Sequence, residues 1–295
     1  MAPRGGGRAM VTADVPGDFV TLAKTHYENF PVGSWLVPRA HRQHIHRIYA
    51  FARIADDLAD ERRDAAALRA YREAFLAHAE PSHRAVALFA DLWESIRERD
   101  LPMQLFLDLL DAFEQDLRVG RYADAAQLFD YCRRSADPVG RLVLRVFGHR
   151  DAALDTLSDR VCTGLQLLNH LQDLRSDLLE RDRIYFPVAD LTRHGVAESD
   201  LRATVASAGV RAFVRDWLDR TAKLLHDGWP ITSAVRGRLR YELRAILGGA
   251  AGCVRAIRAA DYDVLAAHRG VRGFARLFAV GGALLRSGPP AALRE

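Results

Sequence analysis

Cysteine is scarce in this sequence: only three occur among the 295 residues, namely Cys132, Cys162 and Cys253. None lies in a Cys-x-x-Cys or Cys/His spacing, so the sequence does not encode a zinc finger or zinc ribbon. A small, odd number of cysteines also argues against a disulfide-stapled secreted scaffold and favours a reducing compartment. We therefore expect a cytoplasmic protein.

Long apolar runs are missing too. The best candidate, residues 274–285, is too short to cross a bilayer and carries Arg276. Residues 1–17, rich in Gly, Ala and Arg, lack the apolar centre of a secretory signal, so we expect a disordered tail. The apolar C-terminal stretch favours loose peripheral contact with the inner membrane. The formal net charge is only +4 and the basic residues are dispersed, which argues against nucleic-acid binding.

Alternating runs of β-branched residues are nearly absent, whereas Ala, Leu, Arg, Glu and Asp fill long stretches. With 49% hydrophobic and 27% charged residues and no internal repeat, the chain is predicted to form a single all-α domain over 18–285, followed by a flexible tail over 286–295. The predicted helices lie near 18–29, 40–61, 64–78, 83–98, 103–118, 124–134, 138–147, 151–180, 198–204, 208–227, 231–246, 248–259 and 271–285.

The first informative segment, 41–61, reads HRQHIHRIYAFARIADDLADE. On a helix Asp56 and Asp60 lie one turn apart on the same face, with Arg53 beside them. Both sides of this helix carry apolar residues, so the helix is predicted to be buried. Two buried like charges are costly unless a divalent ion or Arg53 compensates them. The alternative is a solvated acidic patch at the end of a helix, which Asp57 would extend.

The second informative segment, 162–187, reads CTGLQLLNHLQDLRSDLLERDRIYFP. Gln166, Asn169, Asp173 and Asp177 share one helical face, and leucines occupy the opposite face. Taken alone, this is the pattern of an ordinary amphipathic surface helix. However, the polar face holds carboxylates and amides without Lys or Glu, and such oxygen ligands are those that Mg²⁺ takes.

Together the two segments predict a pair of acidic helices that face each other across a helical bundle. Several Mg²⁺ ions held between them would neutralise a diphosphate as it leaves its substrate. An apolar remainder of the cavity would hold a greasy substrate and shield a carbocation from water.

The same segments resemble a known family. Tyr49-Ala-Phe and the string 53–60 resemble the first aspartate-rich motif of squalene and phytoene synthases, and the string 166–187 resembles the second. Further matches are His26, Phe30 and 34–38 near the N-terminus, and Asp116, Tyr122 and Tyr131-Cys132 in the middle of the chain.

This resemblance implies an isoprenoid synthase-type helical bundle around a central cavity, and Mg²⁺-assisted loss of diphosphate. It implies that the metal–diphosphate cluster is held by Asp56, Asp60, Asn169, Asp173 and Asp177, of which the four aspartates are the expected catalytic residues. It also implies that Arg53 contacts diphosphate and Gln166 lines the site, and that His26, Phe30 and Tyr49 lie near the substrate.

Two local strings point to one branch of the family. ENFPVGS at 28–34 and SADPVGR at 135–141 resemble the hydroxysqualene synthases of bacterial hopanoid biosynthesis. Asp137 stands where a glycine is usual and would make the cavity wall more polar. Gly249-Ala250 replaces a tyrosine that is common in phytoene-type members near this position.

The resemblance therefore implies ionisation of presqualene diphosphate and capture of the cation by water, with the substrate handed over by a presqualene diphosphate synthase. One alternative is a condensing enzyme that joins two prenyl diphosphates into presqualene diphosphate, squalene or phytoene. Another is a helical assembly subunit without activity, which the retained acidic motifs disfavour.

Overall fold

The computed structural model describes residues 37–77, 87–266 and 288–294 of the chain. These residues form α-helices and one 3-10 helix, and within them the only β-pairing is an isolated parallel bridge between Arg121 and Ile184. The helices are α2 (Arg39–Asp60), α3 (Ala65–Ala77), α4 (Ala87–Arg99), α5 (Met103–Asp116), α6 (Ala125–Ser135), α7 (Asp137–Val146), α8 (Ala152–Gln172), α9 (Leu174–Arg181), α10 (Val188–Arg193), α11 (Glu198–Leu201), α12 (Ala208–Gly228), α13 (Ile231–Ala234), α14 (Arg238–Ala259) and η1 (Ala291–Leu293). The predicted all-α class is confirmed.

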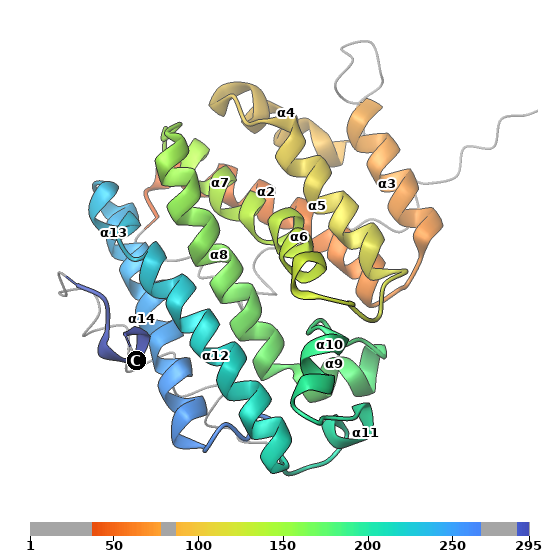
Figure 1. The fold of residues 1–295 in the computed structure, drawn as a ribbon. Helices are drawn as coiled ribbons and strands as arrows, with labels where there is room; N and C mark the ends of the chain where they lie inside the picture. Colours follow the sequence, from red (N-terminus) through yellow and green to blue (C-terminus); the bar gives the residue numbers. More distant parts are fainter. Residues whose placement is uncertain (1–36, 78–86, 267–287, 295) are drawn as a thin grey trace, which may run out of the picture.

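The helices pack around two hydrophobic cores that meet at α7. One core lies among α2, α3, α4 and α5, and the other among α6 and the helices from α8 onward (Figure 1). Leu142 and Val146 of α7 belong to the first core, whereas Leu144 belongs to the second. Because α7 also contacts α2, α5, α6 and α8, it joins the two halves into one body.

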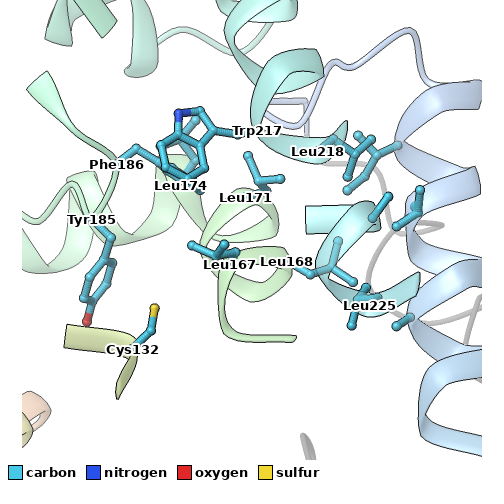
Figure 2. Packing of buried hydrophobic residues seen from close by; sticks show 14 of the residues in the cluster. Cys132, Leu167, Leu168, Leu171, Leu174, Tyr185, Phe186, Trp217, Leu218 and Leu225 are labelled. Carbon is cyan, nitrogen blue, oxygen red and sulfur yellow. The ribbon is translucent and has the colours of Figure 1, made fainter. Parts of the chain in front are cut away.

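The most extensive contact between two helices of the second core is that of α8 with α12. Leu167, Leu168 and Leu171 lie on one side of α8 and point toward α12 (Figure 2). They are buried, as are their neighbours Trp217, Leu218 and Leu225 on α12. This apolar contact fixes the leucine side of α8, so that its amide and carboxylate side is left for other neighbours.

Two helix boundaries differ from the predicted ones. The predicted helix 151–180 is divided at Asp173, whose backbone (φ −101°, ψ 7°) leaves the α region and starts α9 in a new direction. The predicted break near 247 is wrong, because α14 runs through Gly248 and Gly249. The chain turns instead at Gly237, whose φ of +67° favours glycine.

Two short helices, η1 and α10, also differ from the predicted structure. Residues 291–293, expected within a flexible tail, form η1 and bury Leu293 against α12 and α14, while Arg258 donates to the Ala292 carbonyl at 2.8 Å. Helix α10 was not expected from the sequence. The helices predicted at 18–29 and 271–285 lie outside the described residues.

Candidate active site

The carboxylates of α2 form one side of the candidate site. Asp56 and Asp60 lie at its C-terminal end with side chains 37% and 19% exposed, so they are less buried than the sequence suggests. Arg53 bonds Asp56 at 3.2 Å and Asp57 at 2.6 Å within the same helix. Burial first, and then the neighbouring Asp60, raise the pKa of Asp56 to about 7. Arg53 lowers this pKa but does not offset the effect of burial together with Asp60.

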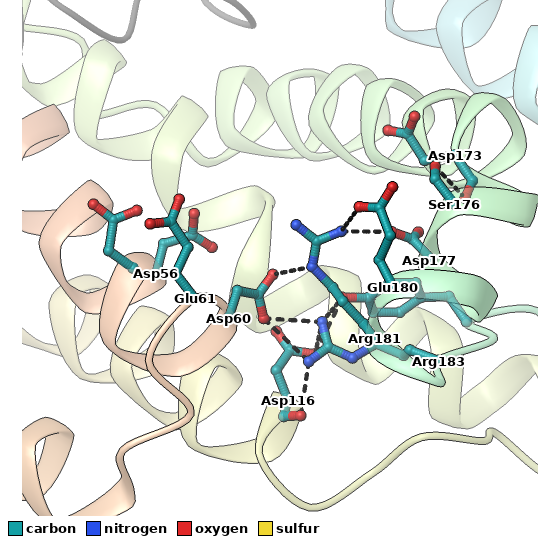
Figure 3. A network of polar contacts seen from close by, with 12 residues as sticks. Asp56, Asp60, Glu61, Asp116, Asp173, Ser176, Asp177, Glu180, Arg181 and Arg183 are labelled. Carbon is teal, nitrogen blue, oxygen red and sulfur yellow. Dashed lines mark hydrogen bonds and ion pairs between the residues drawn. The ribbon is translucent and has the colours of Figure 1, made fainter.

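Asp177, from the second acidic segment, faces Asp60 across two arginines (Figure 3). Arg183 places both terminal nitrogens 3.1 Å from Asp60 Oδ1. Arg181 lies between the two segments, with Nε 3.4 Å from Asp60 Oδ2 and Nη1 3.4 Å from Asp177 Oδ1. Residues more than 100 positions apart in sequence thus form one charged cluster where the two cores meet.

A buried polar network holds Arg183 in place. Its Nη2 donates to the Asp116 carbonyl oxygen at 2.8 Å, and its Nη1 donates to the Tyr185 hydroxyl at 2.7 Å. The hydroxyls of Tyr131 and Tyr185 donate to the Asp116 carboxylate at 2.8 and 3.2 Å. Burial raises the pKa of Asp116 to about 6 although Arg183 lowers it. His170 stacks on Tyr185 with ring centroids 3.7 Å apart, and burial lowers its pKa to about 3, so the imidazole is neutral.

The backbone that follows Arg183 is fixed by pairing with the loop after α5. The Ile184 N–H donates to the Gly120 carbonyl and the Val188 N–H to the Tyr122 carbonyl, each at 2.9 Å. A Cβ at Gly120 would lie 3.0 Å from the Asp182 carbonyl oxygen, so this close approach favours glycine. The pairing delivers Arg183 to the end of α5 and to Asp60.

The remaining residues of the second segment follow the α8–α9 junction. Asp173 is the junction residue, and Asp177 lies in the first turn of α9 with its side chain 13% exposed. Burial first, and then Asp173, raise the pKa of Asp177 to about 7. Asn169 is exposed one turn before the junction, and Gln166 Nε2 lies 3.3 Å from His170 Nε2.

The donor set fits Mg²⁺ better than a softer metal. Its oxygens are carboxylate and amide, and burial first, with neighbouring carboxylates second, raises the pKa of two of the aspartates, Asp56 and Asp177. Among the described residues, no three His, Cys, Asp or Glu side chains are grouped closely enough to hold a metal by themselves.

Comparison with known proteins identifies the family. The sequence model described as squalene/phytoene synthase matches residues 23–275. The chain belongs to the squalene/phytoene synthase family.

Several members of the family are similar over most of their length. Hydroxysqualene synthases from Sinorhizobium fredii and Rhodopseudomonas palustris are 36% and 37% identical, over 79% and 81% of this chain and 80% and 82% of theirs. The structure of squalene synthase HpnC from Alicyclobacillus acidocaldarius is 41% identical and has a TM-score of 0.76. The match covers 83% of this chain and 93% of that one. A dehydrosqualene synthase structure, 21% identical with a TM-score of 0.77 over 90% of this chain and 93% of that one, supports the fold alone.

Most of the predicted site residues of this family member lie in the described part of the chain. Tyr49 is partly buried on α2, two turns before Asp56. Asp137 is 7% exposed at the start of α7 and accepts a 2.8 Å hydrogen bond from Thr163, one turn before Gln166 on α8. His26 and Phe30 lie outside the described residues, and their expected place near the substrate stays a prediction.

Arg181 and Arg183 were not among the predicted site residues. The signal for Arg183 was its place in the second motif string, and the signal for Arg181 was its i, i+4 spacing from Asp177. Neither signal indicates a contact with Asp60, because that contact depends on how α2 and α9 meet.

Proposed function

We propose that this squalene/phytoene synthase-family protein ionises presqualene diphosphate with Mg²⁺ and captures the cation with water, which yields hydroxysqualene and diphosphate. The observation that carries the proposal is the meeting of Asp60 and Asp177, from the two aspartate-rich segments, at one cluster. The branch rests on relatives named hydroxysqualene synthase at 36% and 37% identity.

The metal ligands in this proposal are Asp56, Asp60, Asn169, Asp173 and Asp177. When bound, Mg²⁺ would supply charge that stabilises the departing diphosphate. The buried network beneath the site would keep Asp60 oriented, because Arg183 holds one of its oxygens and Asp116 in turn holds Arg183. Arg53, bonded to Asp56, would lie beside the same diphosphate.

Water capture requires a polar group in an otherwise apolar surrounding. Asp137 is the candidate, because its buried carboxylate lies close to the Gln166 face of α8 and is oriented by Thr163. Burial first, and then Asp159, raise the pKa of Asp137 to about 7. Such a group can orient a water molecule and accept its proton as the carbon–oxygen bond forms. Without an ordered water, the cation would lose a proton or await a hydride instead.

The second candidate is head-to-head condensation of two prenyl diphosphates. It is favoured by a presqualene diphosphate synthase from Rhodopseudomonas palustris that is 32% identical over 63% of this chain, and by a phytoene synthase from Thermus thermophilus that is 31% identical over 83%. The acidic segments are expected in both branches, so they do not discriminate between the two reactions.

The test supplies each substrate separately to purified protein with Mg²⁺ in ¹⁸O-water and identifies the products by mass spectrometry. We expect presqualene diphosphate to give ¹⁸O-labelled hydroxysqualene without NADPH, and farnesyl diphosphate alone to give little product. Efficient use of farnesyl or geranylgeranyl diphosphate, or an unlabelled hydrocarbon product, would move the assignment to the condensing branch.

Substrate and product of the proposed reaction are both lipids. This supports the expected hand-over from a presqualene diphosphate synthase and the expected loose membrane contact, both of which stay predictions, as does the cytoplasmic location. Among the described residues, no helix is long and apolar enough to cross a membrane.

A further inference from the structure

Two arginines contact Asp60, but they contact different oxygens. Arg183 approaches Oδ1 with both terminal nitrogens at 3.1 Å, whereas Arg181 approaches Oδ2 at 3.4 Å. One oxygen of Asp60 is therefore held from the interior, and the other faces the gap toward Asp177 (Figure 3).

The surroundings of the two guanidinium groups differ as well. Arg183 is 4% exposed and also bonds the Asp116 carbonyl oxygen and the Tyr185 hydroxyl at 2.8 and 2.7 Å. Removing it from this place would leave buried acceptors without their donor, which is costly. Arg183 is therefore a permanent part of the fold.

Arg181 is held much more loosely. Its side chain is 34% exposed, and its ion pairs with Asp60, Asp177 and Glu180 are long, at 3.4, 3.4 and 3.7 Å. Partly exposed ion pairs of this kind contribute little to stability. Glu180 is 67% exposed, so it offers the guanidinium an alternative partner on the solvent side when the other two carboxylates are occupied.

We propose that Arg181 is an exchangeable counter-cation: it bridges Asp60 and Asp177 in the metal-free protein and is displaced when a divalent ion binds these carboxylates. The inference deepens the proposed function, because it rests on the same carboxylates binding metal. An ion that coordinates Asp60 Oδ2 and Asp177 Oδ1 approaches the atoms that Arg181 contacts, so the two cations exclude each other. Arg181 thereby holds the two acidic segments together until metal arrives.

The coupling between the two cations is reciprocal, so it is measurable without turnover. We expect Arg181→Gln to bind Mn²⁺ about threefold to tenfold more tightly than the parent protein. The reason is that the metal no longer has to displace a guanidinium whose ion pairs have the strength usual for partly exposed groups. Isothermal titration calorimetry with Mn²⁺ alone measures this. Thermal unfolding should show a lower midpoint for Arg181→Gln in EDTA and no deficit at saturating Mn²⁺. Arg181→Lys, which keeps the charge, should bind Mn²⁺ with nearly the parent affinity.

Arg193→Gln is the matched control. Arg193 bridges Asp190 at 3.3 Å and Asp216 at 2.7 Å between two other helices, and its side chain is 53% exposed. Its loss should leave the Mn²⁺ affinity unchanged and lower the midpoint equally with and without metal. Unchanged or weaker Mn²⁺ binding by Arg181→Gln, or no Mn²⁺ binding by the parent protein, would overturn the proposal. If Arg181→Gln behaves as expected but presqualene diphosphate gives no hydroxysqualene, only the proposed reaction fails.

Discussion

At the scale of single residues, Asp60 is the point where the stability of the fold and the proposed chemistry meet. Its carboxylate neutralises the buried Arg183 from one side and belongs to the proposed metal ligands on the other. Replacing Asp60 is therefore expected to lower both the stability of the fold and the turnover. Exposed acids near the end of the same helix do not have this double role.

Asp60→Asn tests this double role. The amide keeps the shape but removes the charge that Arg183 faces, so we expect a loss of about 1–3 kcal/mol in unfolding free energy. Turnover should fall by about 10–100-fold or more as a metal ligand is lost. Denaturant unfolding and product formation are the two measurements.

Glu61→Gln is the control for this change, because Glu61 is 61% exposed and pairs only at the surface with Arg53, at 2.9 Å. We expect its unfolding free energy to differ from that of the parent protein by no more than about 0.5 kcal/mol, and its turnover to be nearly normal. A stable Asp60→Asn protein would mean that Asp116 alone is enough to compensate Arg183.

At the scale of elements, the close contact of α7 with α8 sets the position of the second acidic segment. A Cβ placed on Gly140 of α7 would lie 2.2 Å from Ser158 Oγ and 2.5 Å from Cys162 Sγ of α8. To admit a Cβ here, the Ser158 and Cys162 side chains or the helices themselves must shift. On the same helix, Asp137 reaches Thr163 of α8. Residues 135–141, which resemble one branch of the family, thus also pack α7 against α8.

Gly140→Ala should therefore force α7 and α8 apart and reduce stability by about 1–3 kcal/mol. The matched change is Gly249→Ala on α14, where a Cβ meets no atom of the described residues within 4 Å. Since alanine is the better helix former, that variant should be neutral or more stable by about 0.5–1 kcal/mol. Thermal unfolding of the two variants compares them directly, and equal midpoints would contradict the close-contact argument.

At the scale of the whole molecule, the acidic cluster joins α2, which packs in the first hydrophobic core, to α9, which packs in the second, so the halves are joined partly through opposed charges. Asp56 and Asp177, on opposite sides of the cluster, have pKa values raised to about 7. Because their pKa values are higher in the folded protein than in the unfolded chain, these two carboxyl groups bind protons more readily in the folded protein. Their contribution to stability is complete below the unfolded pKa, about 3.9, and is lost as pH rises through about 7.

Metal-free protein should accordingly become less stable between about pH 5 and pH 8. Acids with lowered pKa values, such as Asp130 and Asp227, stay ionised over this range. His41, His44 and His170, whose pKa values burial lowers, act in the opposite sense below about pH 6.5. Asp116 and Asp137, whose pKa values are also raised, add to the decline and outweigh the histidines. Mg²⁺ binds the ionised carboxylates, so it should restore stability most at pH 8. Denaturant midpoints in EDTA and in Mg²⁺ at both pH values measure this.

Asp177→Asn removes one of these titrating groups and should flatten the metal-free decline. A midpoint that rises from pH 5 to pH 8 in EDTA, or one that Mg²⁺ leaves unchanged at pH 8, would be incompatible with a metal-binding acidic cluster.

The sequence by itself determined the helical class, the family, and the helical face that carries Asp56 and Asp60. These follow from spacing within one helix, because a period of 3.6 residues fixes which side chains share a face. It also indicated the buried sides of the first acidic helix, where Phe51 is fully buried.

Tertiary structure alone decided how these faces meet. The contact of Arg183 with Asp60 joins residues 123 positions apart, and the break at Asp173 that turns α9 toward α2 has no glycine or proline to announce it. The uninterrupted course of α14 through Gly248 and Gly249 is likewise set by packing that outweighs local propensity. Local periodicity carries no information on such long-range pairings, since they depend on the summed burial of both cores.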